Sequence, residues 1–135
     1  DPRERIRFRN LLVELSRNRI VIFSTHIIED IASSCNQVGV INKGSVKYHG
    51  TPAEMAEIAK EVTWTFEIPA REFAQLSSDL LIVHHIRNGE NIKVRCLSET
   101  QPVPSAVHTT PLLEDSYLWL LRSVKLANNE QIITQ

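Results

Sequence analysis

Polar side chains that could handle a proton or a phosphate follow directly after an apolar run near residue 20. The run covers residues 20–23, and Ser24, Thr25 and His26 come next. A histidine changes charge near neutral pH, so His26 could hydrogen-bond a phosphate or relay a proton. Ser24 beside His26 suggests a nucleophile with its base, but no flanking glycine elbow accompanies the pair. His26 is therefore the candidate chemical group here, and the alternative is a surface or capping histidine in a strand-to-helix turn.

The elements around these side chains determine what they can reach. Four consecutive apolar residues, three of them β-branched, predict a strand buried on both faces. A helix is expected over residues 27–35, because apolar residues recur there at helical spacing. The polar trio then lies at the carboxyl end of a strand, the edge where open α/β sheets bind ligands.

A metal site is a second chemical hypothesis for the same region. His26 and Glu29 are one helical turn apart, and Asp30 follows them. A bound metal normally needs three or four ligands, and the sequence offers no obvious others. His84 and His85 are neighbours on a predicted strand, so their rings point to opposite faces and cannot chelate together. A small metal-dependent hydrolase built around His26 is kept only as a third alternative.

Composition excludes several classes of function. The chain has 135 residues, enough for one ordinary domain or two small ones. With 15 basic and 16 acidic residues, it offers no electrostatic case for binding nucleic acid or an anionic membrane surface. Cys35 and Cys96 form no metal or redox spacing, which favours reduced thiols in a cytosolic setting.

The first residue is Asp1, and the only methionine is Met55. We therefore expect the chain to be either processed or a piece of a longer protein.

The first part of the chain, up to about residue 60, alternates helices and strands. Asp1 as cap, Pro2 in the first turn and Glu4 predict a helix that runs to about Arg17. After the helix at 27–35, the sequence predicts a strand at 37–41, a glycine-containing turn at 42–44, a returning strand to residue 49, and a short capped helix from 51 to about 60.

The second part, from residue 61, has a different order of predicted elements. The expected elements are strands at 62–68, 80–86 and 92–96, a short helix at 70–77, and a final helix from Thr110 with an apolar stripe of Leu113, Tyr117, Leu120, Leu121 and Val124. Phe73, Leu76, Trp64, Trp119 and Cys96 are expected to pack inward. This order is a split β-α-β-like pattern, so we expect an α+β unit.

The order of features in residues 1–60 resembles the last third of the nucleotide-binding domain of ABC transporter ATPases. That resemblance makes Asp1 and Pro2 the end of the D-loop, which contacts the opposite subunit. It makes residues 24–26 the H-loop, with His26 as the switch histidine that contacts the γ-phosphate of ATP. Residues 38–50 resemble the terminal hairpin of the family, which leads into Gly-Thr-Pro.

Residues 110–118 are similar to the Leu-Glu-Asp-x-aromatic-Leu ending of ATPases from drug and antibiotic exporters with an ABC-2-type membrane partner. The resemblance implies an α/β fold. Residues 1–60 would be the carboxy-terminal part of a P-loop ABC nucleotide-binding domain, and residues 61–135 a small α+β accessory or regulatory domain.

The phosphate-binding parts of that family are not in this sequence. Its four glycines are scattered, so no glycine-rich phosphate loop can form, and the signature sequence and catalytic glutamate would precede Asp1. In full length, the resemblance implies ATP hydrolysis with Mg²⁺, driving export through a transmembrane permease. Such a subunit pairs with a second nucleotide-binding subunit on the cytoplasmic face of the plasma membrane. The chain alone is expected to be inactive, with neither ATP nor metal bound.

A rival hypothesis is a non-catalytic regulatory or dimerisation module. The strand at 62–68 and the helix at 112–126 would then form its interface. Under either hypothesis we expect self-association, because residues 1–60 lack most of their sheet and expose apolar surface. The coding sequence upstream of Asp1 separates the two, since only an ATPase needs a phosphate loop there.

Overall fold

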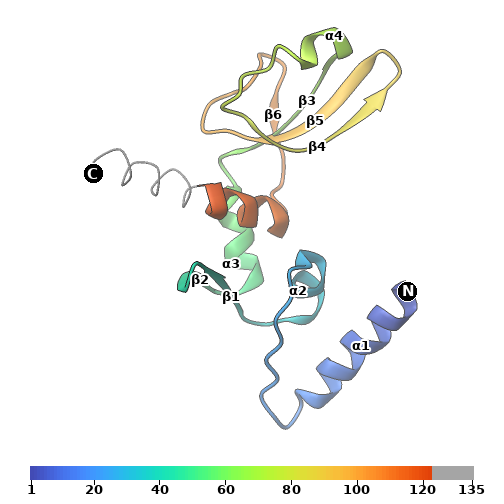
Figure 1. Cartoon of the computed structure of the whole chain (residues 1–135), viewed down its shortest axis with the longest axis vertical. Coiled ribbons are helices and arrows are strands. Elements are labelled where there is room, and N and C mark those ends of the chain that lie inside the picture. Colours follow the sequence, from blue (N-terminus) through green and yellow to red (C-terminus); the bar gives the residue numbers. More distant parts are fainter. Residues whose placement is uncertain (123–135) are drawn as a thin grey trace. The chain divides into compact units, whose positions relative to one another are not determined.

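The computed structural model describes residues 1–122, which fold as two compact units, Asp1–Pro52 and a second unit that begins at Ala53 (Figure 1). The sequence placed the division near residue 61. In the structure, the segment just before that point is bonded into the second unit, since the Thr63 hydroxyl donates to the Ala59 carbonyl at 2.6 Å. The Ser116 hydroxyl donates to the Ala56 carbonyl at 3.0 Å.

Within residues 1–122, no helix is long and apolar enough to cross a membrane.

The first unit opens with the predicted helix, α1 (Pro2–Leu15). The Asp1 carboxylate caps it by accepting from the backbone N–H of Arg3 at 3.0 Å, and Pro2 occupies the first turn as expected. The helix ends at Leu15 rather than at Arg17. None of its residues is buried, so its apolar residues Leu11, Leu12 and Leu15 find no core within this unit.

The strand predicted at residues 20–23 does not form, and this prediction is wrong for the described structure. Residues 20–25 belong to no helix or strand, and the side chains of Ile20 and Ile22 are each 91% exposed. A strand exists only by pairing with a neighbour, and no strand of residues 1–122 pairs with this segment. The β-branched residues favour a strand, but this unit supplies no neighbouring strand for them to pair with.

The rest of the first unit follows the sequence prediction closely. Helix α2 (Ile28–Ser34) is followed by an antiparallel hairpin of β1 (Val38–Asn42) and β2 (Ser45–Gly50). The turn carries positive φ at Lys43 (51°) and Gly44 (77°), the backbone that a tight hairpin requires. Val38 and Val40 are the buried residues of this hairpin.

The second unit is an antiparallel sheet with short helices. Its elements are α3 (Pro52–Ala56), a 3-10 turn η1 (Glu57–Ala59), β3 (Thr63–Pro69), α4 (Ala70–Phe73), β4 (Leu81–Asn88), β5 (Asn91–Leu97) and β6 (Val107–His108). Residues 113–122 are helical. The strand order is β4-β5-β3-β6. The sequence predicted all of these except β6, a two-residue strand that pairs with β3 after the proline-containing segment. The described fold is thus mixed, with two antiparallel sheets and no parallel one.

The core of the second unit lies on one face of its sheet. Trp64, Phe66 and Ile68 alternate inward along β3, opposite Cys96, Val94 and Ile92 of β5. Phe73 and Leu76 pack against this cluster as predicted, and Cys96 is fully buried as predicted. Burial raises the pKa of the Cys96 thiol to about 11.

The helix at 113–122 and α4 lie on opposite sides of this sheet (Figure 1). Leu113 of the predicted apolar stripe is buried, whereas Tyr117, Leu120 and Leu121 are half-buried. Trp119 is half-buried as well. Val124 lies outside the described residues.

Candidate functional site

A cavity of about 490 Å³ lies in the first unit beside the residues that the sequence singled out. Helix α1, residues 23–25 and the first turn of α2 border it on its closed sides. Its lining is Asp1, Glu4, Arg5, Phe8, Arg9, Leu12, Phe23, Ser24, Thr25 and Asp30. Apolar rings and chains thus alternate with both signs of charge, so the cavity has no strong preference for an anion.

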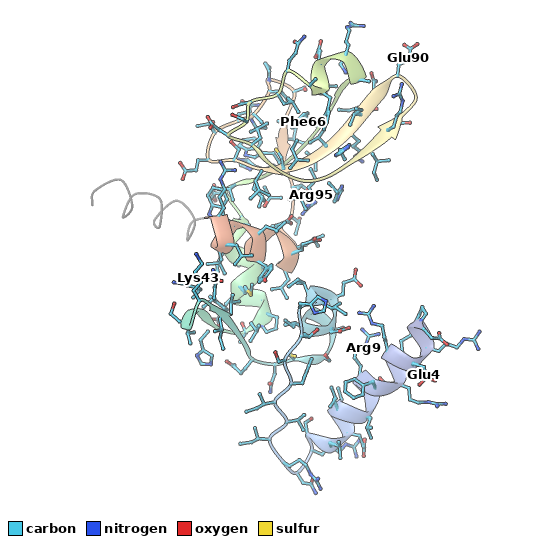
Figure 2. All side chains as sticks on the ribbon, in the orientation of Figure 1. Glu4, Arg9, Lys43, Phe66, Glu90 and Arg95 are labelled. Atoms are coloured by element: carbon cyan, nitrogen blue, oxygen red, sulfur yellow. The ribbon has the colours of Figure 1, made fainter. Side chains whose placement is uncertain are left out.

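Polar contacts across this cavity attach α1 to α2. The Arg5 guanidinium donates to the Asp30 carboxylate at 2.8 Å, and this hydrogen bond raises the pKa of Arg5. Arg9 reaches from α1 and donates to the Ser33 hydroxyl at 2.6 Å (Figure 2). Both arginines are therefore already engaged within the protein.

The structure places the predicted site residues only partly together. Asp1, Ser24 and Thr25 line the cavity, but His26 does not. The His26 side chain is exposed, two residues before the first residue of α2. The Thr25 hydroxyl accepts from the backbone N–H of Ile27 at 2.9 Å and so fixes the turn that carries His26.

The metal hypothesis gains no support from the geometry. Residues 1–122 hold no group of three or more His, Cys, Asp or Glu side chains placed to share an ion. Asp30, one of the residues proposed for it, is paired with Arg5 instead. His84 and His85 pair in register with Arg95 and Val94, on opposite faces of the sheet, as predicted.

The sequence analysis missed a buried ion pair in the second unit. Arg95 of β5 donates from Nε to the Asp115 Oδ1 at 3.0 Å, and its Nη2 makes a shorter contact with Oδ2. The sequence pattern was ambiguous: Arg95 alternates with the buried residues of β5, and Asp115 lies within the predicted final helix. An arginine on a half-open sheet face is usually solvated, so the pattern alone did not indicate a partner.

Two curated proteins match the chain. It is 23% identical over 134 residues to the uncharacterized ABC transporter ATP-binding protein YxlF of Bacillus subtilis (strain 168), across 87% of the chain. It is 36% identical over 52 residues to ABC transporter A family member 11 of Dictyostelium discoideum, across 38% of the chain. The chain is similar to ABC transporter ATP-binding proteins.

The chain spans 45% of the length of the Bacillus protein and 6% of the Dictyostelium protein. No family model matches it. No solved structure matches it either. These two relatives support the resemblance to ABC ATPases in its general form. The exporter type, the ABC-2-type partner and the roles of His26 and Asp1 stay predictions.

Proposed function

We propose that this chain is the carboxy-terminal portion of an ABC transporter ATP-binding subunit. In full length, that subunit binds ATP with Mg²⁺ and hydrolyses it to drive export through a transmembrane permease. The similarity to an ABC ATP-binding protein over 87% of the chain supports this proposal. The observation that carries it is the unpaired apolar segment at residues 20–23, which ends in Ser24, Thr25 and His26.

The exposure of this segment has a physical consequence. Burying one isoleucine side chain stabilises a fold by about 1.5–3 kcal/mol, yet Ile20 and Ile22 are each 91% exposed. Helix α1 likewise exposes Phe8 and Leu11. A parallel sheet, supplied by the remaining part of an ATP-binding domain, would pair with residues 20–23 and cover both faces. The carboxyl end of the paired strand would then carry His26 to the ligand-binding edge.

The residues of this chain have limited roles in that mechanism. His26 contributes one hydrogen bond at the γ-phosphate, and Asp1 contacts the second nucleotide-binding subunit. The phosphate loop, the Mg²⁺ ligand and the catalytic glutamate come from the remaining part of the domain. The chain by itself hydrolyses no ATP, and the complete subunit works on the cytoplasmic face of the plasma membrane, bound to its permease.

The test is ATP hydrolysis by the protein extended with the sequence encoded upstream of Asp1. The proposal expects Mg²⁺-dependent ATPase activity that His26→Ala lowers roughly a hundredfold or more, as removal of one positioned donor does. His84→Ala is the matched control, because His84 is an exposed histidine of the second unit. Activity unchanged by His26→Ala would remove His26 from the mechanism, and an extended protein without ATPase activity would overturn the proposal.

A dimerisation module is the second candidate, but the strand expected in its interface, β3, is paired on both edges and its apolar residues are buried. Helix α1 offers an exposed apolar surface instead, formed by Ile6, Phe8, Leu11 and Val13, each about half exposed. Light scattering on the chain alone, with and without Phe8→Asp, tests whether this surface joins two copies. A dimer that Phe8→Asp dissociates, in a protein that has no phosphate loop upstream, would favour this module over the ATPase.

A further inference from the structure

The Arg95 side chain lies on the face of the sheet opposite the core and binds the segment that starts the final helix. Figure 2 shows it on the side of the helix at 113–122, whereas Phe66 lies on the core side. Besides its two bonds to Asp115, the Arg95 guanidinium donates to the Thr110 carbonyl at 3.0 Å. One side chain of β5 therefore holds the whole turn that starts the helix.

The Asp115 carboxylate also accepts a hydrogen bond from its own segment. Its Oδ2 accepts from the backbone N–H of Leu112, the residue before the helix, at 2.7 Å, as the third residue of a helix does in a capping box. The next residue makes a second attachment, because the Ser116 hydroxyl donates to the carbonyl of Ala56, the last residue of α3.

The attachment of the helix is mainly polar at its buried end. Of residues 113–122, those that are buried are Leu113, Asp115 and Ser116. The Asp115 side chain is 1% exposed and that of Arg95 is 11% exposed. The apolar cluster around Phe66 and Val94 lies on the other face, and no residue of the helix belongs to it.

We propose that Arg95 and Asp115 form a latch that docks the helix at 113–122 onto the sheet. The bonds from Ser116 to the Ala56 carbonyl and from Arg122 to the Asp79 carbonyl are its further attachments. When either latch residue is lost, the other is left as a buried charge without a partner, which disfavours the docked state far more than the pair favours it. The helix is then released while the sheet stays folded, since the core cluster is untouched. Release is thus a local opening of the fold and not its global unfolding.

Hydrogen exchange measured by mass spectrometry on the full chain tests the latch. Arg95→Met should speed exchange of the backbone amides in 112–122 roughly a hundredfold or more. The amides of β3 should keep their protection. Lys93→Met is the matched control, because Lys93 is on the same strand and the same face as Arg95 but is exposed. It should leave both regions unchanged.

A mutant cycle separates a latch from general stabilisation. Asp115→Asn keeps an acceptor for the Leu112 N–H but removes the charge, and it should release the helix as Arg95→Met does. The double variant R95M/D115L leaves no buried charge unpaired, so it should recover part of the protection. The proposal would be overturned if amides 112–122 of Arg95→Met exchanged at the wild-type rate, or if β3 and 112–122 lost protection equally. It would also be overturned if these amides exchanged faster in the double variant than in either single variant.

Discussion

The rings of Trp64 and His108 stack with their centroids 3.7 Å apart and their planes inclined by 27°. Trp64 lies in the middle of the sheet on β3, and His108 faces it from β6, the two-residue edge strand. The Trp64 indole N–H also donates to the Ser98 carbonyl at 3.0 Å. A single buried ring thus attaches both β6 and the end of β5 to the core.

His108→Ala should loosen β6 without unfolding the sheet. The lost stacking is worth about 0.5–1.5 kcal/mol, and the amide of Thr109, which donates to the Thr63 carbonyl, should exchange faster. His84→Ala, an exposed histidine on the opposite edge strand, is the control and should change neither stability nor exchange. Equal effects of the two variants would show that the stack contributes nothing.

The stability of the second unit should fall in alkaline solution because of Cys96. Burial raises the pKa of this thiol from 9.0 to about 11, so in that interval the unfolded chain loses its proton while the folded chain keeps it. The folded state therefore binds more protons, and the free energy of unfolding decreases as pH rises, by up to about 3 kcal/mol. Chemical denaturation at pH 8 to 11 measures the decrease. Cys96→Ala should reduce this slope, whereas Cys35→Ala should retain it.

Substitutions at Lys43 and Gly44, in the hairpin turn of the first unit, should change stability in opposite directions. Lys43 and Gly44 both have positive φ, which a lysine adopts less readily than an asparagine does. Lys43→Asn should raise stability by about 0.5 kcal/mol, and Gly44→Ala should lower it by about 1 kcal/mol. Thermal unfolding of the chain checks both. Lys47→Asn, within β2, should not stabilise, and a stabilising Gly44→Ala would contradict the turn geometry.

An acidic residue at position 22 should be tolerated by the chain alone. Because the Ile22 side chain is 91% exposed, Ile22→Asp should change the free energy of unfolding by no more than about 0.5 kcal/mol. Val94→Asp, in the buried core of the second unit, should unfold that unit. If the proposed ATP-binding domain is formed by the protein extended upstream of Asp1, Ile22→Asp should instead abolish its folding. A large loss in the chain alone would show that residue 22 already has a partner there.

Local signals predicted the elements that depend on local chemistry. Asp1 and Pro2 determined where α1 begins, and Gly44 determined where the first hairpin turns. Alternation along β3 and β5 predicted which side chains form the core, because successive residues of a strand point to opposite faces. Phe73 and Leu76 were placed correctly by a different signal, since residues three apart in a short helix lie on one face.

The sequence by itself determined which segments prefer helix or strand, and it carried the likeness of residues 1–60 to ABC ATPases. Only the tertiary structure decided which preferences were realised. Residues 20–23 have a strand pattern but no partner in the described chain, whereas β6 has almost no pattern and forms because β3 offers it a free edge. Arg95 and Asp115, twenty residues apart, meet only once the sheet and the helix exist. Strand pairing and ion pairs join distant parts of the chain, so local composition cannot specify them.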